Sequence, residues 1–233
     1  MPLVVGVLLA TVLSYPIGLL IGSAYLLPIL NAAPAYAAMF VLLRRGQARQ
    51  AVALMLAWAV TLGVTATVSF AVWPRALDAT VVNGPEYRDE MFAWIHTGVG
   101  REGSPRLFIP QHLVHLAAFV ALSLVTGSAL SIAMGAVLMN YMAFYVASLG
   151  RAGVPAWAVL LLGWQPWALC RVAAFTVLGV VLAQPLVRRT IREAAPPSWR
   201  PWLLLAGIGL AADVILKAWL APTWGRWLHA VLP

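Results

Sequence analysis

Long apolar runs separated by short polar segments dominate the chain. Five runs stand out: Pro2 to Leu43, Ala51 to Trp73, Phe108 to Gly150, Val154 to Val187 and Trp202 to Leu220. A helix rises about 1.5 Å per residue and the hydrocarbon core of a bilayer is about 30 Å thick, so roughly 20 apolar residues make one span. The second and fifth runs therefore each predict one transmembrane helix. The other three runs are too long for a single span.

Two of the longer runs divide at recognisable points. The run from Phe108 to Gly150 fits two spans joined tightly near Gly127. The run from Val154 to Val187 is short for two spans, and Pro166 interrupts it. Because proline lacks the amide donor and clashes with the preceding turn, we expect a half-helix, a break at residues 163–166 and then one span.

The first run, Pro2 to Leu43, leaves two interpretations open. It can hold two spans, or one span followed by a half-helix that restarts at Pro34 after Asn31. With either, the predicted fold is all-α: a polytopic transmembrane helix bundle of six or seven spans, with one or two broken or half-helices. We expect residues 1–233 to form a single integral membrane domain.

Composition agrees with this class. Hydrophobic residues make up 63% of the chain and charged residues 9%, too few polar side chains for a water-soluble domain to cover its surface. The net charge of +8 comes almost wholly from arginine, and without a basic stripe on a soluble fold it predicts no nucleic-acid partner. The lipid bilayer is the expected partner. A lone cysteine, Cys170, excludes a disulfide framework or a cysteine zinc site within one chain.

The arginines predict how the chain is oriented. Loops on the cytoplasmic side carry an excess of basic residues, and arginines cluster in the segments 44–50 and 188–200. In the loop 74–106, acidic residues offset the arginines. We therefore expect the two clusters to be cytoplasmic, the loop 74–106 and the C-terminus to be external, and the membrane to be the plasma (inner) membrane of a prokaryote.

The loop 74–106 contains a predicted helix of its own. Gly84-Pro85 is typical of a helix start and Gly98 of a helix stop, and an apolar face lies between them. That face consists of Tyr87, Met91, Trp94 and Ile95. We expect a short interfacial helix on the outer surface, acting either as a lid over a membrane cavity or only as an amphipathic spacer.

Two ionisable residues lie inside the last apolar run. Asp213 is the only acidic residue in any predicted span, and Lys217 is the only lysine of the chain. An ionisable group at mid-bilayer costs roughly 2.5–3.5 kcal/mol on insertion scales, so such groups are rare and usually functional. Their four-residue spacing places both on one helix face, where they can neutralise each other.

Arg171 offers Asp213 a second partner. It follows Pro166 by five residues and cannot lose its proton, so it needs an anion, carbonyl groups or water. If Arg171 takes Asp213, Lys217 is left for a carboxylate or phosphate of a substrate. The alternative is structural: both cations can extend to the interface along their aliphatic stems, or belong to an ion network that only fixes the helices.

Further polar residues at membrane depth are candidates for the same pathway. Gln165 lies at the predicted break and Asn140 within a span, and each can line a cavity, cap a helix or bond across a helix interface. His112 and His115 are one turn apart, a spacing compatible with a metal or haem. Interfacial histidines that bond to water or backbone are the commoner case, and the sequence names no particular cofactor.

Three functions follow from these patterns. The first is a permease or channel-like protein that moves a small anionic or proton-coupled solute through an outward-facing polar cavity. The second is a non-catalytic membrane subunit of a larger complex, or a homo-oligomer. The third is an intramembrane enzyme that acts on a lipid-borne substrate with a histidine base. Common hydrolase, zinc-protease and nucleotide-binding motifs are absent from the sequence, so an enzyme is the less favoured interpretation.

Overall fold

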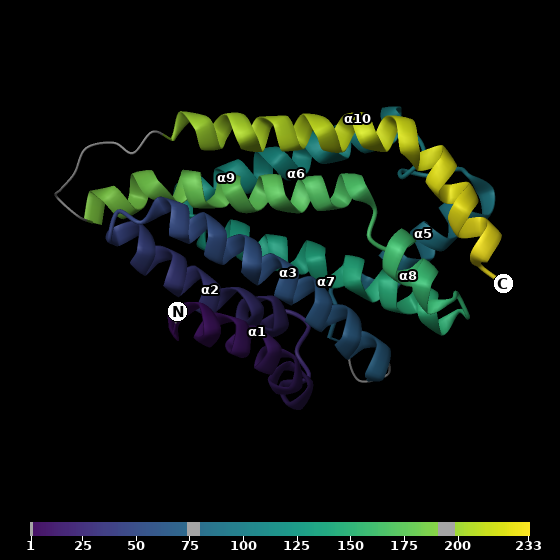
Figure 1. Cartoon of the computed structure of the whole chain (residues 1–233), viewed down its shortest axis with the longest axis horizontal. Helices are drawn as coiled ribbons and strands as arrows, with labels where there is room; N and C mark the ends of the chain where they lie inside the picture. Colours follow the sequence, from purple (N-terminus) through teal and green to yellow (C-terminus); the bar gives the residue numbers. More distant parts are fainter. Residues whose placement is uncertain (1, 74–79, 191–198) are drawn as a thin grey trace.

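The computed structural model describes residues 2–73, 80–190 and 199–233, and these residues form nine helices and no strand (Figure 1). In chain order the helices are α1 (Pro2–Ile21), α2 (Leu26–Arg44), α3 (Ala48–Val72), α5 (Gly84–Thr97), α6 (Pro105–Thr126), α7 (Ala129–Arg151), α8 (Ala156–Leu162), α9 (Pro166–Thr190) and α10 (Arg200–Val231). The predicted all-α class is confirmed.

Six of the described helices, α2, α3, α6, α7, α9 and α10, are long and apolar enough to cross a membrane. They lie roughly side by side in the bundle of Figure 1. The helix α1 is also apolar along its 20 residues. The chain is therefore an integral membrane protein with several spans, as the hydropathy pattern predicts.

The first apolar run forms two helices. The chain turns between α1 and α2 at Gly22, where φ is +68°, a left-handed conformation that glycine adopts without steric cost. Asn31 and Pro34 both lie inside α2. The interpretation of a half-helix restarting at Pro34 is therefore wrong, because the helix runs through this proline without ending.

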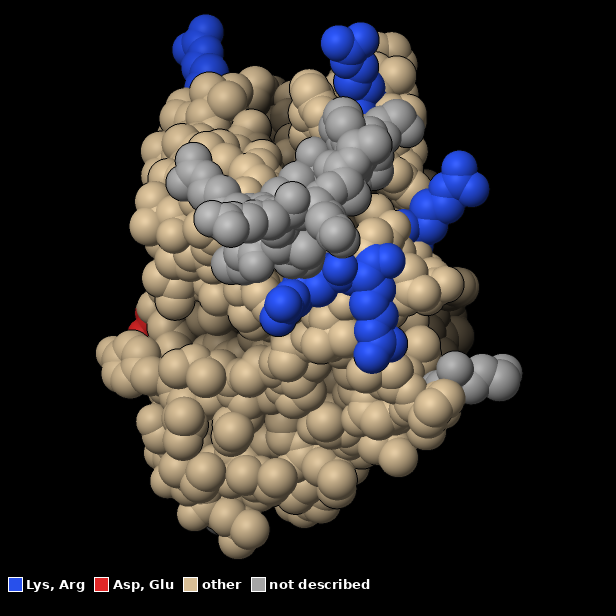
Figure 2. All heavy atoms as spheres, turned by 90° about the vertical axis from the view of Figure 1, so that its left-hand side faces the viewer, with Lys and Arg blue, Asp and Glu red and all other residues tan. Residues whose placement is uncertain are grey.

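The helices alternate in direction, so the connections gather at two ends of the bundle (Figure 1). At one end, which we call the arginine end, the α2–α3 turn and the start of α10 carry the exposed arginines 44, 45, 49 and 200. Figure 2 shows this end with basic side chains and almost no acidic ones. The α6–α7 turn packs on α9, where Ser128 donates a 2.7 Å hydrogen bond to the Gly179 carbonyl.

The opposite end, which we call the α5 end, holds α5, α8 and the C-terminus (Figure 1). Gly225 of α10 packs so closely on Trp94 of α5 that an added Cβ would lie 3.1 Å from the indole ring. The buried apolar side chains of the bundle form two clusters. The larger joins α1, α2, α3, α7 and α9. The smaller joins α5, α7, α8, the start of α9 and the C-terminal part of α10.

A buried chain of hydrogen bonds ties the N-terminal helices to α7. The Tyr15 hydroxyl donates to Asn140 Oδ1 (2.6 Å), the Asn140 amide donates to Asn31 Oδ1 (2.8 Å), and the Asn31 amide donates to Ser14 Oγ (2.6 Å). The indole of Trp58 on α3 donates to the Asn31 carbonyl. This polar network specifies how α1, α2, α3 and α7 pack, because each buried amide finds its partner in only one arrangement.

Replacing the central residue of this network should destabilise the bundle. We expect Asn31→Ala to lower the free energy of unfolding by about 1–3 kcal/mol, since it leaves the buried Asn140 amide without its acceptor and removes the donor to Ser14 Oγ. The matched control is Thr61→Ala, whose hydroxyl bonds only to the Ala57 carbonyl of its own helix and whose loss should cost below about 0.5 kcal/mol. Unfolding by SDS titration in mixed micelles measures both. Equal losses would contradict a specifying role for the network.

Candidate functional site

The predicted break between α8 and α9 is present. Helix α8 ends at Leu162, α9 begins at Pro166, and the Trp224 indole of α10 donates 2.8 Å to the Leu162 carbonyl that the break frees. Glycine is required at position 163, because an added Cβ would overlap the Val159 carbonyl and lie 2.8 Å from Val146 Cγ1. The carbonyl freed by the break therefore has a hydrogen-bond partner in α10.

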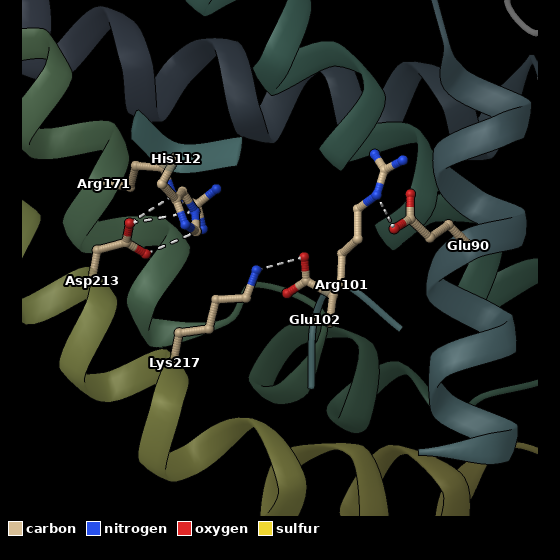
Figure 3. Close-up of polar contacts among 7 residues, drawn as sticks. All are labelled: Glu90, Arg101, Glu102, His112, Arg171, Asp213 and Lys217. Carbon is tan, nitrogen blue, oxygen red and sulfur yellow. Dashed lines mark hydrogen bonds and ion pairs between the residues drawn. The ribbon is translucent and has the colours of Figure 1, made fainter. Parts of the chain in front are cut away.

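Arg171 and Asp213 form the central ion pair of the site (Figure 3). The guanidinium of α9 donates to the carboxylate of α10 through Nε (3.0 Å) and Nη2 (3.1 Å). This bidentate geometry is the strong form of such a pair. The Asp213 side chain is 2% exposed, whereas Arg171 keeps 23% of its side-chain surface and lines a cavity. The pairing that the sequence offered as one alternative is thus the one observed.

Lys217 is not left without a partner. Its ammonium lies 2.9 Å from Glu102 Oε1, with side-chain exposures of 2% and 11% for the two residues (Figure 3). The ammonium also lies 4.8 Å from the ring centroid of buried Phe108, a cation–π contact. The expectations that Lys217 neutralises Asp213 or stays spare therefore both differ from the structure, because a carboxylate from the connection between α5 and α6 occupies it.

His112 and His115 lie on α6 and both line the cavity. His112 Nε2 is 3.7 Å from Asp213 Oδ2 (Figure 3), so this imidazole sits beside the central ion pair. Within the described ranges 2–73, 80–190 and 199–233, the residues His, Cys, Asp and Glu form no group of three or more that could hold a metal. A metal bound by His112 and His115 therefore stays a prediction without a third ligand among these residues.

A cavity of about 100 Å³ lies among these groups, between α6, α7 and α9 and reaching α3. Its polar lining is Tyr87, Glu102, Gln111, His112, His115, Tyr141, Gln165, Arg171, Thr176 and Lys217. The remaining lining is mostly methionine and aromatic, including Met55, Trp58, Met139, Met142, Trp164, Trp167 and Phe175. This space can hold several water molecules or a compact solute, and its lining combines apolar and charged side chains.

Two buried donors at the break are unpaired. The amide nitrogen of Gln165 and the indole nitrogen of Trp167 have no hydrogen-bond partner among the described residues, and both residues line the cavity. Gln165 is 1% exposed and Trp167 is 0% exposed. An unpaired buried donor costs about 1–3 kcal/mol, so two of them beside one cavity indicate a place for an acceptor.

Asn140 does not join the other candidate residues. Its side chain is committed to Tyr15 and Asn31 in the polar network, and the cavity is lined by its neighbours Met139 and Tyr141 instead. The structure thus brings Arg171, Asp213, Lys217 and Gln165 to one region with the two histidines, and separates Asn140 from them. Glu102 is the residue that sequence reasoning missed; its only signal was a carboxylate three residues before the start of α6.

The helix predicted in the loop 74–106 is α5, and it covers one end of the cavity. Met91, Trp94 and Ile95 are buried in the smaller apolar cluster, and Tyr87 lines the cavity with its ring centroid 4.5 Å from that of Tyr141. Burial raises the pKa of the Tyr87 phenol well above its ordinary value, so this hydroxyl stays neutral. The two predicted roles, a lid or an amphipathic spacer, both stay predictions.

Replacing one partner of the central ion pair should destabilise the protein far more than replacing both partners. We expect Asp213→Asn to lower the free energy of unfolding by about 3–5 kcal/mol, because it leaves the Arg171 guanidinium without its counterion. The double variant Arg171→Met/Asp213→Leu should recover most of that loss, because apolar side chains of similar volume need no counterion. Unfolding in mixed micelles measures both. If Asp213→Asn were as stable as wild type, the pair would not be a buried structural contact.

Comparisons with protein-family models, with curated proteins and with solved structures find no match to this chain. The cavity and its charges are therefore the basis for the function proposed next.

Proposed function

We propose that the protein is a permease or channel-like membrane protein that binds and moves a small anionic solute through the cavity beneath α5. The observation that carries this proposal is the pair of unpaired buried donors, Gln165 and Trp167, beside Arg171 and Lys217. All four groups present N–H donors to one space, and donors with positive charge are what an anion requires.

The broken helix supports the same conclusion. The N-terminus of α9 begins at Pro166, where Gln165 lines the cavity. Helix N-termini carry a partial positive charge, and transporters use discontinuous helices near mid-membrane to present such ends to anionic groups. The break also leaves the side-chain donors of Gln165 and Trp167 beside the cavity without partners among the described residues, which a purely structural bundle does not require.

The direction of the cavity follows from the arginines. The arginine end carries exposed arginines with almost no acidic side chains beside them (Figure 2). At the α5 end, acidic residues of α5 such as Glu86 and Asp89 offset exposed arginines such as Arg101. An excess of basic residues is typical of the cytoplasmic side of membrane proteins. We infer that the arginine end is cytoplasmic and that α5, the cavity entrance and the C-terminus face the exterior. The solute then enters from outside, past Tyr87 and Glu102.

Flux through reconstituted protein tests the proposed function. Purified protein in liposomes should accelerate uptake of at least one of chloride, phosphate, lactate and benzenesulfonate over protein-free liposomes. Trp167→Phe and Gln165→Leu should each lower that rate by about tenfold, because a hydrogen bond to a charged group contributes about 1.5–3 kcal/mol. Trp167→Phe retains an aromatic ring, so it removes the donor with the least change in packing.

The control for flux is Thr61→Ala, which changes a hydroxyl on α3 bonded within its own helix and outside the cavity lining. It should transport like wild type. Absence of protein-dependent flux for all four anions would overturn the proposal, and so would flux that Trp167→Phe and Gln165→Leu leave unchanged in folded protein.

Cysteine labelling tests the orientation. In a Cys170→Ala background, Ala93→Cys on the exposed face of α5 should react with a membrane-impermeant maleimide in intact bacterial cells. Gln50→Cys, exposed near the arginine end, should react only after the cells are permeabilised. The reverse pattern would place the cavity entrance in the cytoplasm.

A further inference from the structure

We propose that Glu102 is a tethered occupant of a carboxylate-binding subsite, and that the ligand of the cavity is a compact monocarboxylate with an apolar body that displaces it. This inference rests on the proposed solute-binding cavity and specifies its ligand. The geometry behind it is the 2.9 Å contact between Glu102 Oε1 and the 2% exposed ammonium of Lys217, at the wall of that cavity.

Lys217 has the features of a built anion site. Its ammonium is buried, and Phe108 provides the ring of a cation–π contact at 4.8 Å. Asp213, one turn away on the same helix, is engaged by Arg171 through both of its oxygens. The carboxylate that meets Lys217 therefore comes from a connecting segment of residues 98–104 rather than from a membrane helix.

The ion pair that this segment forms at the protein surface is weak. A second ion pair of this segment joins Arg101 to Glu90 on α5 at 3.4 Å (Figure 3), with side-chain exposures of 58% and 34%. Such exposed pairs contribute about 0–1 kcal/mol. Gly98 and Gly100 have φ of +68° and +148°, so glycine is favoured at both and the path of the segment is set locally. Glu102 can therefore leave Lys217 without unfolding a transmembrane helix.

Charge balance selects the ligand class. The cluster contains two cations, Arg171 and Lys217, and two carboxylates, Asp213 and Glu102. An anion that enters while Glu102 stays would add an unpaired charge to a low-dielectric space, which is costly. Exchange of Glu102 for a monocarboxylate preserves the balance, whereas exchange for a phosphate dianion does not. A tethered carboxylate already fits the site, so a free carboxylate fits it with the same geometry.

The apolar wall selects the body of the ligand. Besides Lys217 and Glu102, the lining of the cavity includes Tyr87, Met142 and Trp167. A small aromatic or branched aliphatic acid would bury its body against these side chains, and the donors of Gln165 and Trp167 would supply further contacts to its carboxylate. Benzoate is a suitable probe, and benzamide is its neutral counterpart of equal shape.

The test is binding of radiolabelled benzoate to purified full-length protein in detergent. In wild type the tethered carboxylate competes at an effective concentration in the millimolar range, so Glu102→Gln should bind benzoate at least about tenfold more tightly. Glu102→Asp keeps the charge on a shorter side chain, so its affinity for benzoate should lie between those of wild type and Glu102→Gln. Glu102→Gln/Lys217→Met removes both charges of the pair and should bind no benzoate above background.

Thermal unfolding provides a second readout if Glu102→Gln is less stable. Sodium benzoate should raise its melting temperature more than sodium chloride or benzamide does at equal concentration, and the double variant should not respond. Benzoate affinity equal in wild type and Glu102→Gln would overturn the inference, as would equal stabilisation by chloride or benzamide. If wild type moves an anion but these results fail, only the carboxylate subsite is refuted; if benzoate binds as expected without flux in liposomes, only transport is refuted.

Discussion

The neutralisation of charge inside an apolar bundle is the constraint on which the site depends. Arg171, Lys217, Asp213 and Glu102 come from α9, α10 and the connection before α6, and each cation meets one carboxylate. Because an uncompensated charge in this setting costs several kcal/mol, the positions of α6, α9 and α10 are coupled to these contacts. The helices cannot shift past one another without separating a pair.

The rest of the described structure forms two separately packed parts. On one side, the polar network of Tyr15, Asn140, Asn31 and Ser14 fixes the N-terminal helices against α7. On the other, α5, α8 and the C-terminal part of α10 share a separate apolar cluster. The cavity lies between the two, with lining from both. The unpaired donors of Gln165 and Trp167 lie at this cavity, where the two parts meet.

Much of this could be predicted from sequence because the membrane imposes strong rules. Hydropathy and length predict the spans, Pro166 predicts the break that separates α8 from α9, and Arg171 needs an anion that only Asp213 can supply from within a span. Residues whose role depends on three-dimensional position were not predictable. The sequence alone cannot decide that Asn140 meets Tyr15 rather than the cavity, or that Pro34 lies inside a continuous α2.

Glu102 is the clearest example of a residue whose role the sequence alone does not reveal. A carboxylate in a hydrophilic connection is ordinarily solvated, and nothing in its neighbours reveals that the segment folds back until Lys217 is reached. Its partner was visible in the sequence, since a buried lysine requires an anion, but an external solute and an internal side chain satisfy that requirement equally well.

The two ion pairs differ in how they can open. Arg171 and Asp213 are each fixed on a long membrane helix and joined by two hydrogen bonds, so separating them requires moving α9 against α10. Lys217 shares the helix of Asp213, but Glu102 lies on a short connection whose other ion pair, between Arg101 and Glu90, is exposed. The second pair therefore opens at lower cost than the first.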